Sequence, residues 1–232
     1  MAKASQRGIL FDAYGTLFDV YSVGSLAEQI YPGQGAALAA LWREKQVDYT
    51  RLRTLSDRYV DFLKLTEDAL RHACARLRLA LSAAQCERLL GQYHRLTAFP
   101  EVLPTLTQLR SQGFALAILS NGTPRMLESA VDAAGLSGLF THILSADQVR
   151  KYKTAPEVYA LGPAAFTCPA AALVFVSSNA WDACGATWFG YRTFWVNRAA
   201  DPIEQLGVVP TGEGRSLKDL AGFLADDFSS TR

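Results

Sequence analysis

The chain has 232 residues, of which 50% are hydrophobic and 19% charged, a composition typical of a globular protein. The formal net charge of +1 argues against a partner held by bulk charge, such as a nucleic acid or an anionic membrane surface. No apolar run reaches the ~18 residues of a membrane span, and the start has no signal-peptide pattern, so we expect a cytoplasmic protein.

The four cysteines, Cys74, Cys86, Cys168 and Cys184, have neither CxxC nor CxH spacing. We therefore expect no zinc site and interpret all four as buried, reduced thiols. This cysteine usage fits a reducing compartment.

The first apolar segment, GILF (8–11), is predicted to be a buried strand that ends at Asp12. The next stretch, from about residue 19 to about residue 97, contains no convincing strand. Its apolar residues have helical spacing in four segments, 36–53, 56–65, 66–79 and 82–96. Ser82 and Gln85 form a predicted capping box, and Thr66 is a predicted helix N-cap.

Strands and helices alternate after residue 97. The predicted strands are 114–119, 142–146, 172–176 and 192–196, and the predicted helices are 103–113, 123–135, 155–166 and 181–190. Gly113 and Gly135 end two of these helices, and Thr123 with Pro124 begins one. This alternation is typical of an α/β fold with a doubly wound, Rossmann-like parallel sheet. We expect a core of residues 1–18 and 98–232, with an inserted helical cap subdomain of residues 19–97.

Polar side chains follow the predicted strands at their carboxyl ends, where open α/β sheets bind ligands. The first strand ends at Asp12, with Tyr14 and Thr16 beyond it. The later strands lead to Ser120 and Asn121, to Lys153 and Tyr159, and to Ser177, Asn179 and Asp182. Each residue alone has an ordinary explanation, such as a turn, a solvated lysine or a first-turn aspartate. Their occurrence at successive strand ends indicates one site with two carboxylates and an ammonium group.

Four segments in order, FDAYGTLFDV, ILSNG, YK followed by VY, and FVSSNAWD, closely resemble the L-2-haloacid dehalogenases of the haloacid dehalogenase superfamily. The resemblance covers nearly the whole chain, and VSSNAWD is its most specific part. It implies hydrolysis of (S)-2-haloalkanoic acids to (R)-2-hydroxyalkanoic acids and halide, without a cofactor or metal, by a homodimer.

The resemblance also implies a role for each matching residue. Asp12 would attack the substrate and form an ester, which water would hydrolyse; Lys153 would keep Asp12 ionised, and Thr16 and Ser177 would orient it by hydrogen bonds. Asp182, with Asn179 and Lys153, would activate the water. Arg43 in the cap would accept the halide, Ser120 and Asn121 would hold the substrate carboxylate, and the remaining substrate-binding residues would be Tyr14, Phe62, Trp181 and Tyr159.

Two alternatives remain open: a magnesium-dependent phosphatase of the same superfamily and a non-catalytic binder of small acids. In the phosphatases an aspartate two positions past the nucleophile protonates the leaving group, and here Tyr14 stands in its place. Ser178 likewise replaces a magnesium-binding aspartate. A halide leaves as an anion and needs no proton, so both substitutions favour the dehalogenase. The absence of GxSxG and GxGxxG patterns argues against a serine hydrolase and a dinucleotide enzyme.

Overall fold

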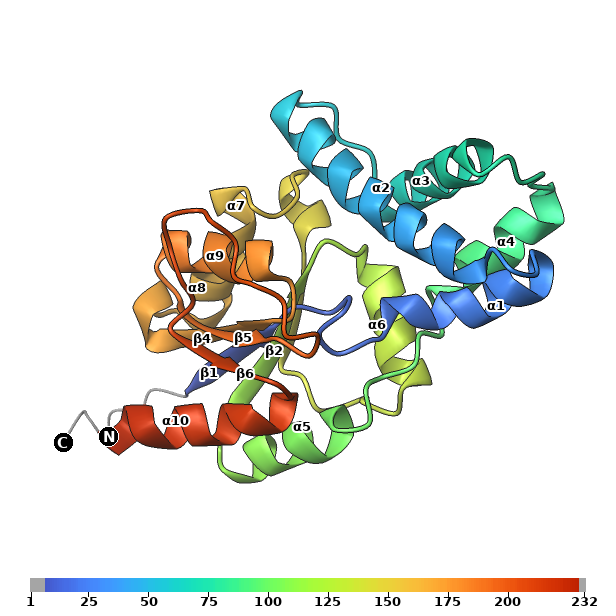
Figure 1. The fold of residues 1–232 in the computed structure, drawn as a ribbon. Helices are drawn as coiled ribbons and strands as arrows, with labels where there is room; N and C mark the ends of the chain where they lie inside the picture. The colour runs from blue at the N-terminus through green and yellow to red at the C-terminus, as the bar shows by residue number, and fades with distance from the viewer. Residues whose placement is uncertain (1–6, 230–232) are drawn as a thin grey trace.

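The computed structural model describes residues 7–229 and contains one sheet of six parallel strands in the order β3-β2-β1-β4-β5-β6 (Figure 1). The strands are β1 (Gly8–Phe11), β2 (Ala115–Ser120), β3 (His142–Ser145), β4 (Leu173–Ser177), β5 (Arg192–Val196) and β6 (Gly212–Gly214). The chain builds outward from β1 to one edge and then from β4 to the other. This order confirms the predicted doubly wound α/β fold.

The central strands are buried on both faces, which explains why their sequences are nearly continuous apolar runs. Ile9 of β1, for example, lies between Leu116 of β2 and Val174 of β4. The short edge strand β6 was not predicted, because its residues, Gly-Glu-Gly, give neither an apolar run nor an alternation.

Among the described residues, six α-helices pack around the sheet: α5 (Val102–Ser111), α6 (Pro124–Ala133), α7 (Pro156–Tyr159), α8 (Leu161–Phe166), α9 (Ala180–Phe189) and α10 (Leu220–Ser229). Helices α5 and α10 lie along one face, and α7, α8 and α9 cover the other (Figure 1). The predicted ends of α6 are confirmed: the Thr123 side chain caps it, Pro124 is its first residue, and Gly135 beyond it has φ +68°.

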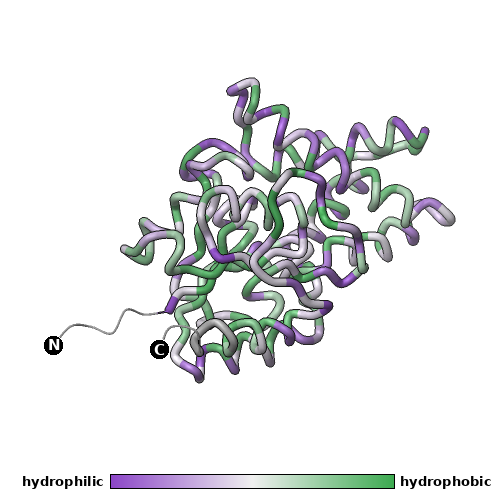
Figure 2. The backbone as a smooth tube through the Cα atoms, turned by 60° about the vertical axis from the view of Figure 1, so that its left-hand side comes forward, coloured by the Kyte–Doolittle hydropathy of each residue, from purple (hydrophilic) through white to green (hydrophobic). Residues whose placement is uncertain are grey.

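Four helices form a separate layer over the carboxyl edge of the sheet (Figure 1). They are α1 (Val23–Ile30), α2 (Gly35–Leu55), α3 (Phe62–Arg76) and α4 (Ala83–Gln92), packed as α1 on α2 and α4, and α3 on α2 and α4. Their turns alternate between hydrophilic and hydrophobic residues in Figure 2, the pattern of helices with one buried face. We call this layer, residues 19–97, the cap.

Two predictions within the cap were wrong and one was confirmed. Residues 56–61 are not helical, and α3 begins at Phe62 because the Asp61 carboxylate accepts the Lys64 N–H. Thr66 is therefore not an N-cap; it lies inside α3, where its hydroxyl donates to the Phe62 carbonyl. The capping box of Ser82 and Gln85 at the start of α4 is present.

The two connections between cap and core run side by side. Asp19 N–H donates to Thr97 O at 2.8 Å, and Phe99 N–H donates to Leu17 O at 3.1 Å. These contacts agree with the boundaries expected near residues 18 and 98, which stay predictions. Within residues 7–229, no helix is both long and apolar enough to cross a membrane.

Candidate active site

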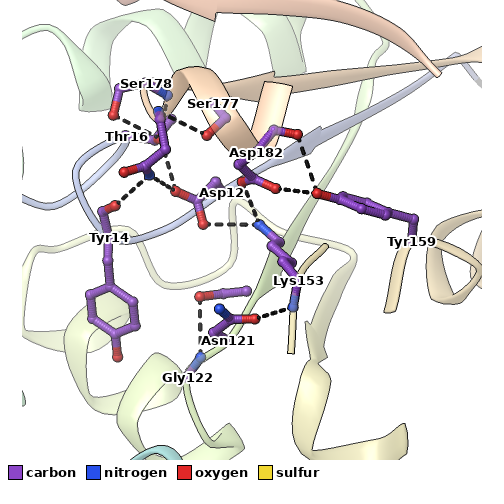
Figure 3. A network of polar contacts seen from close by, with 12 residues as sticks. Asp12, Tyr14, Thr16, Asn121, Gly122, Lys153, Tyr159, Ser177, Ser178 and Asp182 are labelled. Carbon is purple, nitrogen blue, oxygen red and sulfur yellow. Dashed lines mark hydrogen bonds and ion pairs between the residues drawn. The ribbon is translucent and has the colours of Figure 1, made fainter. Parts of the chain in front are cut away.

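The polar residues at the strand ends lie close together (Figure 3), beside a cavity that is lined by residues of both the core and the cap. Asp12 follows β1 directly, and its N–H continues the ladder by donating to Val176 O of β4 at 2.9 Å. Asp182 comes from the first turn of α9, and Lys153 comes from the loop between β3 and α7. The expected convergence of two carboxylates and one ammonium is present.

Asp12 is 5% exposed and is held by donors on both of its oxygens. Lys153 Nζ lies 3.0 Å from Oδ1, whereas Thr16 Oγ1 and Asn179 Nδ2 donate to Oδ2 at 3.1 and 2.9 Å. The Ser178 N–H donates to Thr16 Oγ1 at 2.8 Å and so fixes that hydroxyl. The carboxylate is thus kept in one orientation by charge and by hydrogen bonds.

Lys153 is 2% exposed and bridges the two carboxylates, with Nζ 2.8 Å from Asp182 Oδ2. Burial alone would lower the pKa of Lys153, but the charges and hydrogen bonds of Asp12 and Asp182 outweigh it and raise that pKa. The Lys153 side chain therefore stays cationic at neutral pH.

Asp182 is fully buried, and burial raises the pKa of its carboxyl above the ordinary range, against the opposing effect of Lys153. Its second oxygen, Oδ1, accepts the Tyr159 hydroxyl at 2.7 Å. Burial and the adjacent Asp182 carboxylate raise the pKa of Tyr159, which therefore remains a donor.

One expected contact is corrected by this geometry, and another stays a prediction. Tyr159 is absent from the lining of the cavity at Asp12 and donates its hydroxyl to Asp182, so its contact with substrate stays a prediction. Ser177 makes no hydrogen bond to Asp12: its hydroxyl oxygen accepts the Asn179 N–H at 3.1 Å, and the donors on Asp12 Oδ2 are Thr16 and Asn179. The Asn179 side chain occupies the orienting position on Asp12 that we had expected for Ser177.

Ser120 is the last residue of β2, and Asn121 follows it directly. The Ser120 hydroxyl oxygen accepts the Gly122 N–H at 3.3 Å, which leaves its own proton available. Asn121 Oδ1 accepts the Lys153 N–H at 2.9 Å, so this side chain also fixes the lysine backbone and directs its amide Nδ2 elsewhere. Both residues line the cavity, as expected.

Arg43 reaches the site from the cap helix α2. Its guanidinium donates to Gln46 Oε1 at 2.7 Å and to Asn179 Oδ1 at 3.3 Å. Gln46, Val47 and Thr50 also line the cavity and were not identified from the sequence. They follow Arg43 at helical positions i+3, i+4 and i+7, so the face of α2 that carries Arg43 would have indicated them.

The cavity at Asp12 has a volume of about 20 Å³, close to the minimum for one water molecule. It is lined by residues of both layers: Asp12, Tyr14, Arg43, Gln46, Val47, Thr50, Phe62, Ser120, Asn121, Asn179 and Trp181. Tyr14 stacks on Phe62 with ring centroids 5.5 Å apart, and burial raises the pKa of its phenol. Tyr14, Phe62 and Trp181, which we expect to form an apolar wall, all line the cavity, and their contact with substrate stays a prediction.

Within residues 7–229, no group of three or more His, Cys, Asp or Glu side chains is arranged to hold a metal ion. Ser178, at the position where magnesium-dependent relatives were expected to carry an aspartate, lies with its hydroxyl 3.3 Å from Thr16 Oγ1. It therefore offers a neutral oxygen, a weaker ligand for magnesium than a carboxylate.

Comparison with known proteins identifies relatives over almost the whole chain. Residues 6–190 match the model of the haloacid dehalogenase-like hydrolases. The chain is 47% identical over 212 residues to the (S)-2-haloacid dehalogenase of Pseudomonas sp. (strain YL), covering 91% of each chain, and 41% identical to (S)-2-haloacid dehalogenase H-109 of Pseudomonas putida, covering 95% of this chain and 98% of that one.

Solved structures of L-2-haloacid dehalogenases also match this fold. The L-2-haloacid dehalogenase RSc1362 superposes with a TM-score of 0.93 at 56% identity, covering 96% of this chain and 100% of that one. The enzyme of Xanthobacter autotrophicus with chloropropionic acid covalently bound gives a TM-score of 0.89 at 33% identity, covering 95% and 98%. The identity and the coverage together place the chain in the haloacid dehalogenase superfamily, as a member of its L-2-haloacid dehalogenase family.

Proposed function

We propose that this protein hydrolyses (S)-2-haloalkanoic acids to (R)-2-hydroxyalkanoic acids and halide, with Asp12 as nucleophile. The observation that carries the proposal is the buried row Asp12–Lys153–Asp182, in which one ammonium holds two carboxylates at 3.0 and 2.8 Å. Such a row supplies one carboxylate that attacks the substrate and a second that accepts a proton from water in the later hydrolysis. The relatives named above act on this substrate class by name.

In the first step an Asp12 oxygen attacks the α-carbon from the side opposite the halogen. The carbon–oxygen bond forms as the carbon–halogen bond breaks, and the halogen leaves with the bonding electrons as halide. The product is an ester of Asp12, and the in-line geometry inverts the configuration. The departing anion needs positive charge and donors but no proton, a role that suits the Arg43 guanidinium on the cap side of the cavity.

In the second step a water molecule attacks the carbonyl carbon of the Asp12 ester. Asp182 accepts the water proton, and Lys153, which touches both carboxylates, stabilises the negative charge that develops. The bond between that carbonyl carbon and the ester oxygen on the α-carbon breaks, and the departing alkoxide takes the proton back from Asp182. The second water proton is lost to solvent as Asp12 returns to its carboxylate. The hydroxy acid leaves with an original Asp12 oxygen, and Asp12 keeps the oxygen from water.

The substrate carboxylate is held at the end of β2 in this proposal. The Ser120 hydroxyl and the Asn121 amide Nδ2 are donors that line the cavity close to Asp12. Tyr14, Phe62 and Trp181 line the same cavity and exclude water from it, which strengthens the charge interactions inside. Because the cavity is only about 20 Å³, the cap or the lining side chains must move to admit substrate.

The test is chloride release from (S)-2-chloropropionate in the presence of EDTA. Sustained chloride release with inversion to the (R)-hydroxy acid supports the proposal and a metal-free reaction. Phosphate release from small phosphomonoesters that requires magnesium, without chloride release, would identify the phosphatase instead. Binding of 2-halo acids without either activity would identify a binder.

We also propose a cytoplasmic homodimer. The four cysteines are unpaired thiols, as expected in a reducing compartment, although Cys168 is only partly buried. Leu52 and Leu55 are 60% and 85% exposed at the end of α2 and offer an apolar surface to a second copy. Light scattering on the purified protein tests the dimer, and Leu55→Glu should shift it to monomer.

A further inference from the structure

Arg198 lies two residues beyond β5 and contacts the loop that follows the nucleophile. Its Nη1 donates to Gly15 O and its Nη2 to Thr16 O, both at 3.1 Å. Gly15 has φ +90°, a left-handed conformation that orients this turn. The guanidinium therefore fixes two successive carbonyls of the loop that runs from Asp12 into the cap.

The same guanidinium holds the chain where it returns from the cap. Arg198 Nε and Nη2 donate to Glu101 Oε1 at 3.0 and 2.8 Å, and Cζ lies 3.8 Å from the centroid of the Phe99 ring. Glu101 is 12% exposed and immediately precedes α5. Arg198 thus donates hydrogen bonds to the connection that leads into the cap. It also stacks on Phe99 and pairs with Glu101 in the connection that returns from the cap.

The contacts pass directly to the reacting group. Thr16, whose carbonyl Arg198 holds, donates its hydroxyl to Asp12 Oδ2 at 3.1 Å and accepts the Ser178 N–H at 2.8 Å. A shift of the main chain at Thr16 would move that hydroxyl relative to Asp12. Arg198 itself lines the larger neighbouring cavity of about 810 Å³ and not the small one at Asp12.

We propose that Arg198 is a positioning residue for the nucleophile: it locks the Gly15–Thr16 carbonyls to the returning connection and so keeps the Thr16 hydroxyl on Asp12. The inference rests on the proposed function for its kinetic consequence, although the lock itself is independent of activity. The planar fork of arginine is required, because two carbonyls, a carboxylate and an aromatic face are contacted at once. A lysine ammonium would reach only some of these groups.

Hydrogen–deuterium exchange tests the lock without reference to activity. In Arg198→Lys and Arg198→Met, the peptides that cover residues 12–19 and 97–101 should both exchange faster, by about tenfold or more. The exchange rates of the sheet strands should not change. The matched control is Arg71→Met, which removes a surface pair with Glu67 on α3. Unchanged exchange in either segment would overturn the proposal, even if the wild-type protein proved inactive toward halo acids.

Kinetics test the consequence for Asp12. With (S)-2-chloropropionate, Arg198→Lys should lower the rate of Asp12 ester formation about tenfold, measured by intact mass in single turnovers, while KM changes less than about threefold. In a Thr16→Val background the same change should lower the rate less than about twofold, because the hydroxyl through which Arg198 acts is gone. Losses that multiply in the double variant, or a single variant as fast as wild type, would contradict the positioning role.

Discussion

The Lys153 ammonium lies 2.8 Å from the Asp182 carboxylate, and neither side chain is more than 1% exposed. Burial of this pair makes each charge depend on the other, and Asp12 at 3.0 Å from the same nitrogen adds a second carboxylate. Three ionisable groups thus share two negative charges and one positive charge. The pH dependence of the reaction should follow from that arrangement.

We expect the acid limb of kcat to lie above the ordinary aspartate range. Burial raises the pKa of Asp182, so this base takes up a proton, and ester hydrolysis stops, at a pH where an exposed aspartate would still be ionised. The raised pKa of Lys153 places any alkaline limb from it above the ordinary value of 10.5. In a pH profile of kcat from about 3 to 10, the acid limb should therefore appear and no alkaline limb from Lys153 should appear.

Loss of activity at low pH can be distinguished from unfolding, because protonation of Asp182 lowers activity but adds to stability. The raised pKa means that folded Asp182 binds its proton more tightly than unfolded Asp182, so its contribution to stability grows as pH falls through that window. Acid inactivation without a fall in the melting temperature over the same pH range therefore supports the assignment. An acid limb that survives in Asp182→Asn, measured on its residual activity, would assign the limb to another group.

Asp12→Asn should abolish halide release, by about 10³-fold or more, because a neutral amide is a poor nucleophile. In wild-type single turnovers in H₂¹⁸O, the label should enter Asp12 and not the hydroxy acid, as located by mass spectrometry of peptides. Asp48→Asn, on the exposed face of α2, is the control for the charge change. Label found mainly in the product would mean that water attacks the substrate directly.

The sequence predicted the strands and the later helices well because their signals are local. Apolar runs marked β1, β2, β4 and β5, and the residues Thr123, Pro124 and Gly135 marked the ends of α6. Thr66 failed as an N-cap because Asp61, five residues earlier, already caps α3. Two acceptable caps in one helical pattern cannot be ranked without the packing of the preceding turn.

The site was predicted in its composition but less well in its bonds. Strand ends brought Asp12, Lys153 and Asp182 together, since parallel strands end at one edge. Whether Ser177 or Asn179 bonds to Asp12 depends on side-chain directions in one tight turn after β4. Residue spacing does not determine these directions. The hydrogen bond from the Tyr159 hydroxyl to Asp182 was likewise not predicted, because it too depends on a side-chain direction.

Arg43→Lys should slow the displacement step by about 10²-fold, because lysine cannot present the two N–H groups of a guanidinium toward a leaving halide. The loss should be larger for 2-chloropropionate than for 2-bromopropionate, since the poorer leaving group depends more on stabilisation. Single-turnover ester formation with both substrates measures it. Arg71→Lys on α3 is the matched control. Equal losses of rate for both halides would mean that Arg43 does not stabilise the leaving halide.

Tyr59→Phe should weaken the hold of the cap on the loop that carries Lys153. The Tyr59 hydroxyl donates to Asp147, its ring packs 5.3 Å from that of Tyr152, and the Tyr152 N–H donates to Thr54 Oγ1 at 3.0 Å. Phenylalanine keeps the ring contact and loses one hydrogen bond to a carboxylate, so the unfolding free energy should fall by about 1–2 kcal/mol. A severalfold rise in KM, with kcat nearly unchanged, should accompany this loss of stability because closure over the substrate becomes less favourable.

The control is Tyr49→Phe. The Tyr49 ring packs on His72 inside the cap, and its substitution should change neither KM nor stability by comparable amounts. If the two variants behave alike in KM, the contact at Asp147 stabilises the fold without helping the cap to close.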